Sequence, residues 1–404
     1  MTLSNLYTIS LILTFFTIPV IAQDFKPDNK LIFNLTSNKK DYTKNFDIPK
    51  IKLNYNYRSD NLLSHLELNL IDDKILSFDG THLTYSKNAV NFGIGSINRR
   101  WSFSPKTSLI MSSNSRPIKS IYLKYNAKNK PNFPLLSLLG PWSFELFNGL
   151  NNTDTGPKDS MLLGLRITLE PIKDLEFELI KTSQWGGDDQ KNNLNSFKSA
   201  IIGNVNEGQN SNINQMAGIG FSYLAPKDFI PLRLYAQFIG EDEAGSFPSC
   251  YIHLIGFEWF GTFSSKPLKV GIESVNTQTK LSSNNNCGQN SAYNNSIYPY
   301  TNYGNVMGAP IDSGGSSLTL TNEIQINKTF AIDYSISNVV INDASIYAHR
   351  LSSVRSEGLI NSVSLKWKKN NLNINFGLNY NSLDLNNSGI TSGSSFNIST
   401  AIKF

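Results

Sequence analysis

Apolar and polar residues alternate along this chain with a period of two, and this pattern constrains the fold more than any other feature. Between residues 372 and 380, apolar residues stand at the even positions and Asn or Gly at the odd ones. Similar alternation recurs at residues 51–57, 163–170, 232–238 and 359–368. Because successive side chains of a β-strand point to opposite faces of the sheet, these segments predict strands with one apolar and one polar face.

The alternation alone also fits a soluble β-sandwich, but three features favour a membrane barrel. The segments reach roughly 10 residues, the length that crosses a membrane when a strand is tilted. The chain ends in such a strand, and its terminal aromatic Phe404 resembles the C-terminal signal of bacterial outer-membrane proteins. Short connections such as 171–173 and 369–371 alternate with long ones such as 184–213 and 278–312, which is typical of transmembrane barrels.

We therefore predict an all-β fold: a closed antiparallel transmembrane β-barrel of about 18 strands. Counting back from a periplasmic C-terminus puts the first strand near residue 49, so the barrel domain spans 49–404. The long loops then lie on the outer side, and short connections, among which we count Asp72–Lys74, are expected at the other end. The pattern leaves the strand boundaries within 75–126 open. A barrel of this size is wide enough to hold an aqueous lumen.

Residues 1–22 are predicted to be a secretory signal peptide that is cleaved. The segment is mostly apolar, and the small residues Val20 and Ala22 precede the expected cleavage site. A transmembrane anchor is the alternative, although the stretch is short and Pro19 interrupts its end. Residues 23–48 are polar and are predicted to form a short periplasmic extension or a partial plug of the lumen. Export of a barrel predicts location in the bacterial outer membrane.

Composition excludes several other classes of protein. Hydrophobic residues make up 40% of the chain and charged residues 17%, which is not a disordered composition. The net charge of +5 is spread along the chain, so no nucleic-acid partner is predicted. No metal site and no cofactor are predicted. The two cysteines, Cys250 and Cys287, fall in loops predicted to lie on the same side, which makes a disulfide the favoured hypothesis and two separate thiols the alternative.

Five blocks between residues 90 and 315 resemble, in the same order, the Wzi-type capsule assembly family of outer-membrane proteins. The blocks are 95–117, 139–149 (LGPWSFELFNG), 164–187, 234–245 (LYAQFIGEDEAG) and 293–312. In these blocks the family-motif positions are Arg99, Trp101, Ser108, Asn114, Pro117, Gly240 and Gly245. Arg100 and Ser102 depart from the Trp and Gly of the Arg-Trp-Trp-Gly-Pro-like turn that the family shows at this place.

The resemblance implies a barrel that attaches or assembles capsular or exported polysaccharide at the cell surface by non-covalent binding, without catalysis. It also implies a strand over residues 108–117. The polar segment 23–48 is too short for the helical periplasmic part that the family carries before its barrel. Besides polysaccharide, the expected partners are outer-membrane lipid, lipopolysaccharide and the barrel assembly machinery, the last through the strand that ends in Phe404.

Candidate glycan-binding residues come mainly from an aromatic and Asn-rich loop, because aromatic rings cover sugar C–H faces and amides pair with hydroxyls. They are Tyr293, Asn294, Tyr298, Tyr300, Tyr303 and Asp312, together with Glu241, Asp242, Glu243 and Trp185. The loop could instead pack over the barrel mouth. The three acidic residues could form a solvated turn or pair with luminal Arg. Trp185 could be an interface aromatic. Arg166 and Arg233 are predicted to be basic residues of the lumen that could draw an acidic polymer.

Two other functions remain open at this point. The first is a porin or solute-specific channel, which needs an open lumen. The second is a lipid-modifying barrel enzyme using His253, although the chain has neither an H-E-x-x-H spacing nor a G-x-S-x-G elbow.

Overall fold

The computed structural model describes residues 30–36, 49–72, 75–127, 136–203, 213–226, 230–244, 247–279 and 287–404. The predicted signal peptide lies outside these residues, as do positions 23–29 and 37–48 of the predicted extension. In the part of the chain that is described, no helix is long and apolar enough to cross a membrane.

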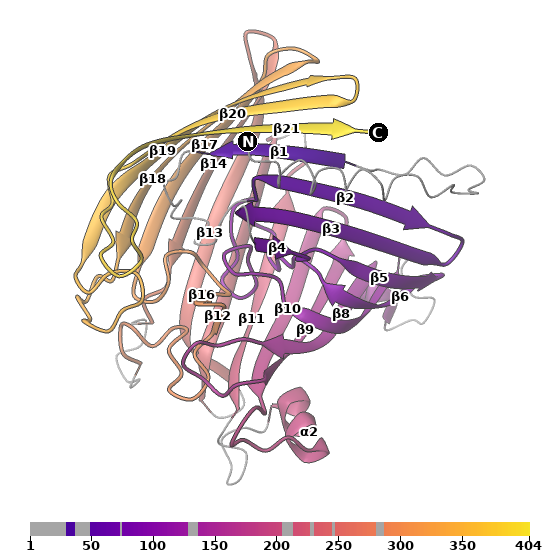
Figure 1. The fold of residues 1–404 in the computed structure, drawn as a ribbon, viewed down its shortest axis with the longest axis vertical. Coiled ribbons are helices and arrows are strands. Elements are labelled where there is room, and N and C mark those ends of the chain that lie inside the picture. Colours follow the sequence, from indigo (N-terminus) through magenta and orange to yellow (C-terminus); the bar gives the residue numbers. More distant parts are fainter. Residues whose placement is uncertain are drawn as a thin grey trace, which may run out of the picture.

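Nineteen strands of the described chain form one antiparallel sheet that closes on itself (Figure 1). Closure occurs at β1 (Lys30–Thr36), which pairs with β2 (Ile51–Arg58) on one side and with the last strand, β21 (Gly393–Lys403), on the other. The short β4 (Ile75–Ser77) and β5 (His82–Lys87) follow one another along the edge of β3 (Leu62–Asp72). Because β4 and β5 together occupy one position beside β3, the nineteen strands fill eighteen positions around the wall.

The remaining wall strands pair in chain order. They are β6 (Val90–Ser96), β7 (Lys119–Ala127), β8 (Trp142–Asn151), β9 (Ser160–Ile172), β10 (Leu175–Trp185), β11 (Asn214–Leu224), β12 (Leu232–Ala244), β13 (Phe247–Phe263), β14 (Lys266–Asn276), β17 (Ser316–Gln325), β18 (Phe330–Ile341), β19 (Ser356–Lys369) and β20 (Leu372–Asn381). Outside the wall lie the hairpin of β15 (Thr301–Asn302) and β16 (Asn305–Val306), the 3-10 helix η2 (Leu136–Leu139) and helix α2 (Leu194–Ile202).

The period-two pattern separates an apolar outer face from a polar inner face. On β20, Phe376, Leu378 and Tyr380 point outward and are 38–51% exposed, while Asn375 and Asn379 point into the lumen. In a soluble protein such a row of exposed aromatic and aliphatic side chains would be unfavourable. In a barrel wall it is the surface that lipid covers, and closure leaves no unpaired backbone edge.

The predicted fold class and strand count are confirmed, but the position of the first strand is wrong. Residues 30–36 form β1 in the wall, so this part of the predicted extension belongs to the barrel. Residues 108–117, expected to form a strand, contain none. Seven of these side chains are buried in the lumen, at positions 108–112, 114 and 115, whereas a strand of the wall would expose every second one to lipid. Because this expected strand is absent, every strand before it runs in the direction opposite to the predicted one. The β3–β4 connection, which was predicted at the short-connection end, therefore lies at the long-loop end.

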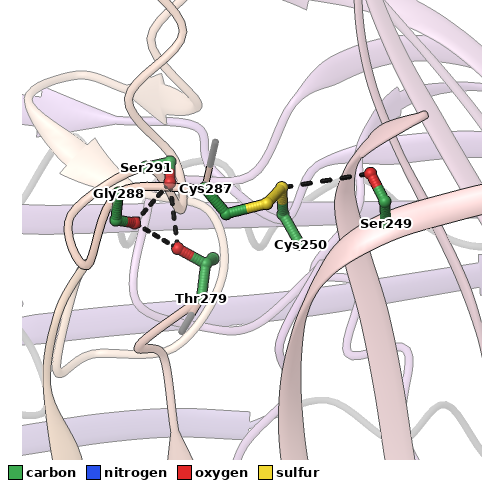
Figure 2. The surroundings of a disulfide bond; sticks show 6 residues. All are labelled: Ser249, Cys250, Thr279, Cys287, Gly288 and Ser291. Atoms are coloured by element: carbon green, nitrogen blue, oxygen red, sulfur yellow. Dashed lines mark hydrogen bonds between the residues drawn. A yellow bond between two sulfur atoms is a disulfide. The ribbon is translucent and has the colours of Figure 1, made fainter. Parts of the chain in front are cut away.

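The structure joins Cys250 and Cys287 in a disulfide, with Cα atoms 5.7 Å apart (Figure 2). The pairing hypothesis is thereby confirmed over two separate thiols. Beside the bond, the hydroxyls of Thr279 and Ser291 both contact Gly288 O, so the chain after Cys287 is fixed at two further points. The bond ties β13 to the long connection between β14 and β17.

Candidate functional site

The outer part of the lumen is filled by loops that fold inward from the long-loop end. Segments 97–118, 287–315, 342–355 and 382–392, here called the plug, share one hydrophobic core with inward-facing wall residues. Its buried members include Trp101, Leu109, Ile110, Tyr293, Tyr300, Met307, Leu351 and Leu385 from the loops and Phe147, Ile239, Leu254 and Val339 from the wall. Each large side chain that leaves water in this way contributes roughly 1.5–3 kcal/mol, which makes the folded-in state favourable.

Family-motif residues anchor the first plug segment to the wall. Arg99 Nε donates to Glu145 Oε1 at 2.7 Å, and its guanidinium lies 4.0 Å from the Phe147 ring centroid. Ser108 Oγ donates to Trp101 O at 2.7 Å. Asn114 Nδ2 donates to Val306 O at 2.9 Å, which joins this segment to the next one. These residues therefore position the plug. Gly240 lies in β12, and Gly245 falls outside the described residues.

Three tyrosines of the predicted glycan loop are buried in the plug. Tyr293, Tyr298 and Tyr300 are each at most 1% exposed. Their hydroxyls donate to Leu109 O at 2.7 Å, Gly186 O at 2.8 Å and Ile110 O at 2.9 Å, respectively. Burial raises the pKa of Tyr298 to about 12, so its hydroxyl remains a donor at physiological pH. The prediction that these rings stack on sugar is wrong for this arrangement, because no part of them reaches the surface.

Asp312 and Asn294, also predicted to bind glycan, instead hold two plug segments together. Arg350 forms an ion pair with Asp312, and its Nε lies 2.8 Å from Asp312 Oδ2. Arg350 Nη1 donates to Asn294 Oδ1 at 2.5 Å. Burial alone would raise the pKa of Asp312, but the guanidinium outweighs it and holds the pKa below its usual value. Both predicted binding residues are thus engaged inside the protein.

Other predicted site residues are placed as follows. Tyr303 remains 38% exposed, with the Arg116 guanidinium 4.5 Å from its ring centroid, so it is still available at the plug surface. Glu241 faces the buried interior and is 9% exposed, while the side chains of Asp242 and Glu243 lie outside the described set.

Trp185 is covered by helix α2. Its ring lies 5.5 Å from that of Phe197, and its Nε1 donates to Asn148 Oδ1 at 3.2 Å.

The predicted basic residues of the lumen are paired with acidic ones. Arg166 Nη2 lies 2.7 Å from Glu178 Oε2, and Arg233 Nη1 lies 2.8 Å from Glu258 Oε2. Arg233 also donates to Phe103 O at 2.7 Å and so holds the plug. These two arginines fix structure, and their charge is compensated locally.

A cavity of about 350 Å³ lies between the plug and the wall formed by β14 and β17–β21. Its size falls within the roughly 300–1,000 Å³ of typical ligand pockets. The wall side is lined by small hydroxyl and amide side chains, namely Ser317, Thr319, Ser335, Ser337, Ser362, Asn379, Asn381 and Ser395. Lys106 and Glu273 supply charge to the lining. We take this cavity as the candidate site.

The cavity offers many neutral hydrogen-bonding groups. Hydroxyls both donate and accept, and amides present two donors and an acceptor, which matches a ligand that carries many hydroxyls. Hydrogen bonds between neighbouring strands hold these groups in place. Thr319 Oγ1 lies 2.9 Å from Ser337 Oγ, and Ser362 Oγ lies 2.7 Å from Asn379 Oδ1. Sequence reasoning placed such residues on the polar strand face but did not find the cavity.

The hypothesis of a lipid-modifying enzyme centred on His253 gains no support from its surroundings. His253 faces outward, and its ring packs against Phe238 with centroids 6.5 Å apart. Within the described residues it makes no hydrogen bond to a serine or a carboxylate that could orient it as a base.

Comparisons with known proteins agree on one family. The family described as capsule assembly protein Wzi matches residues 19–387. An uncharacterised 55.8 kDa protein from the cps region of Klebsiella pneumoniae is 28% identical over 190 residues, which are 46% of this chain and 38% of that protein. The match thus spans under two fifths of that relative's length.

Solved structures show the same fold. An Escherichia coli outer-membrane protein, Wzi, involved in group 1 capsule assembly and described as a carbohydrate-binding β-barrel, superposes with a TM-score of 0.80 at 19% identity. The superposition covers 99% of this chain and 87% of the other. The outer-membrane protein OprD of Pseudomonas aeruginosa gives a TM-score of 0.52 at 9% identity, with 95% of each chain covered.

Proposed function

Because this chain belongs to the Wzi family of capsule assembly proteins, we propose that it lies in the bacterial outer membrane and binds capsular or another exported polysaccharide at the cell surface. The cavity beside the plug is the observation that carries this proposal. Its lining of Ser, Thr and Asn side chains suits sugar hydroxyls, and its volume suits a short stretch of polymer.

Binding through such a cavity is non-covalent and made of many weak contacts. A polysaccharide repeats its units, so one chain can engage several barrels at once, and the combined affinity then exceeds that of any single site. This supports a role in holding polymer on the cell. The exposed Tyr303 and the acidic residues Asp242 and Glu243 near the end of β12 remain candidate contacts for polymer, whereas Glu241 is buried.

The remaining proposed partners follow from the location. The apolar outer face of the wall contacts outer-membrane lipid, lipopolysaccharide surrounds the outer end, and the strand ending in Phe404 meets the barrel assembly machinery. The porin alternative is less well supported, because a packed plug occupies the outer part of the lumen.

Filling the cavity tests the proposal. Ser337 faces the cavity from β18, so Ser337→Phe places a ring in the space that a sugar would occupy. We expect polysaccharide affinity to fall by about tenfold or more, equivalent to about 1.4 kcal/mol. The measurement is calorimetric titration of the purified barrel with polysaccharide recovered from the same bacterium.

The matched control is Ser274→Phe. Ser274 lies on β14 between the lumen-facing residues Glu273 and Val275, so it points outward and is exposed. The same substitution there leaves the cavity unchanged, and affinity is expected to stay at the wild-type level. Wild-type affinity in Ser337→Phe would show that polymer binds elsewhere.

A further inference from the structure

Helix α2 packs on the outside of the barrel wall near the long-loop end (Figure 1). Odd-numbered residues of β10 face outward, and Phe177 and Leu179 in this series are 40% and 47% exposed. The next residues of the series contact the helix. Lys181 Nζ donates to Ile201 O at 3.0 Å, and Ser183 Oγ donates to Ala200 O at 2.9 Å. The helix therefore covers the outer face of the wall directly beyond its lipid-facing part.

The two faces of α2 differ in what they contact. Ala200 and Ser196 are buried against the wall, and Phe197 packs on Trp185 with Leu163 nearby. On the other side three large apolar residues have no such cover: Leu194 is 80% exposed, Ile201 43% and Ile202 74%. A helix that faced water on this side would favour polar residues at these positions.

The position of α2 along the barrel axis indicates what its exposed side faces. Lys181 pairs across the sheet with Leu165 of β9 and with Ala217 of β11, which are apolar outward-facing residues. Without α2, the wall would present a lysine and a serine to lipid at this level. The helix covers both and presents apolar side chains instead, so it continues the apolar belt of the barrel.

We propose that α2 is an interfacial helix that inserts Leu194, Ile201 and Ile202 into the outer leaflet of the membrane. The partner is the lipid of that leaflet, whose acyl chains receive the apolar side chains and whose phosphates meet the exposed Lys198. Lys198 lies four residues from both Leu194 and Ile202 and so shares their face of the helix, and its long side chain extends past them to reach phosphate. The inference rests on the proposed membrane location and is independent of glycan binding.

A nitroxide label at position 202 tests the inference. Ile202→Cys is labelled in the full-length barrel, in which Cys250 and Cys287 are held in their disulfide, and the protein is placed in phosphatidylcholine vesicles containing lipopolysaccharide. Collisions with oxygen report lipid, and collisions with a water-soluble nickel chelate report water. We expect position 202 to favour oxygen, and a label at Tyr347, which is 87% exposed in the plug segment 342–355, to favour nickel.

A third label separates the possible failures. Ile255 faces outward on β13 and is 49% exposed. If position 255 favours oxygen while position 202 favours nickel, α2 lies in water and the inference is wrong. Shielding of position 202 from both reagents would mean that protein covers the helix, which also overturns it. If position 255 itself favours nickel, the membrane location fails, and the α2 inference fails with it.

Discussion

Replacing Asp312 by Ala is expected to loosen the plug, at a cost of up to about 3 kcal/mol, because the substitution leaves Arg350, whose side chain is only 25% exposed, without its ion-pair partner. Asp312 is 3% exposed and pairs with Arg350, which in turn donates to Asn294. His349 Nε2 lies 3.0 Å from Ser313 O beside this pair, so segments 287–315 and 342–355 meet here. Amide hydrogen exchange in residues 288–315 measures the loss, since local opening of the plug exposes these amides.

The control is an ion pair of the same kind at the surface. Asp343 and Arg355 are paired at 2.8 Å, but their side chains are 37% and 44% exposed. Exposed pairs contribute roughly 0–1 kcal/mol, so Asp343→Ala should change exchange little. Equal effects of Asp312→Ala and Asp343→Ala would contradict the role assigned to the buried pair.

The same pair predicts the direction of the pH dependence. The pKa of Asp312 in the folded protein lies below its usual value of 3.8, because Arg350 stabilises the carboxylate more than burial destabilises it. The stability that the Asp312 carboxylate contributes to the plug is therefore complete above about pH 4 and is lost as the pH falls through the folded-state pKa. Acid should loosen the plug of the wild type, whereas Asp312→Asn, which does not titrate, should lack this part of the response.

Excising the plug segment between β14 and β17 is expected to open the lumen and produce a large steady current. Thr277 N donates to Gly315 O at 2.9 Å, so a short Gly-Ser linker can replace residues 278–314 without stretching either strand. The excision removes Tyr293, Tyr300 and Met307, which fill the core of the plug. Porins of similar strand number leave an aqueous channel when nothing fills it.

Single-channel recording in a planar bilayer measures the result. The excision removes Cys287, so it is combined with Cys250→Ser, and the control carries Cys250→Ser and Cys287→Ser with the loop intact. The control is expected to conduct much less than the excised protein. Equal currents in the two proteins would show that this segment does not obstruct the lumen.

The wall could be predicted from the sequence because lipid and lumen impose opposite demands on alternate residues. That constraint acts locally, so segments such as 372–380 indicate their own structure. The plug obeys no such period. Segment 97–118 is fixed by contacts far along the chain, such as Gln237 Nε2 donating to Trp101 O at 2.7 Å. The apolar run in this segment therefore resembled one more strand of the wall. Counting it as a strand gave the wrong direction for every strand that precedes it.

The candidate site was predicted less well, for two physical reasons. A tyrosine ring suits both a sugar face and a buried core, so Tyr293 and Tyr300 could not be assigned from residue type alone. The residues of the cavity, such as Ser337 and Asn379, fit any polar lumen. The cavity residues form a site only because the plug lies opposite them. The family motifs around Arg99, Ser108 and Asn114 hold that plug in position.

The central claim is that this barrel retains exported polysaccharide at the cell surface. The most direct test is to delete its coding sequence and compare cell-attached with released polysaccharide, with wild-type and Ser337→Phe complementation in parallel. We expect the total amount of polymer to stay the same while polymer moves from the cells into the medium, and only the wild-type chain to restore attachment fully. Unchanged attachment in the deletion strain would contradict the claim.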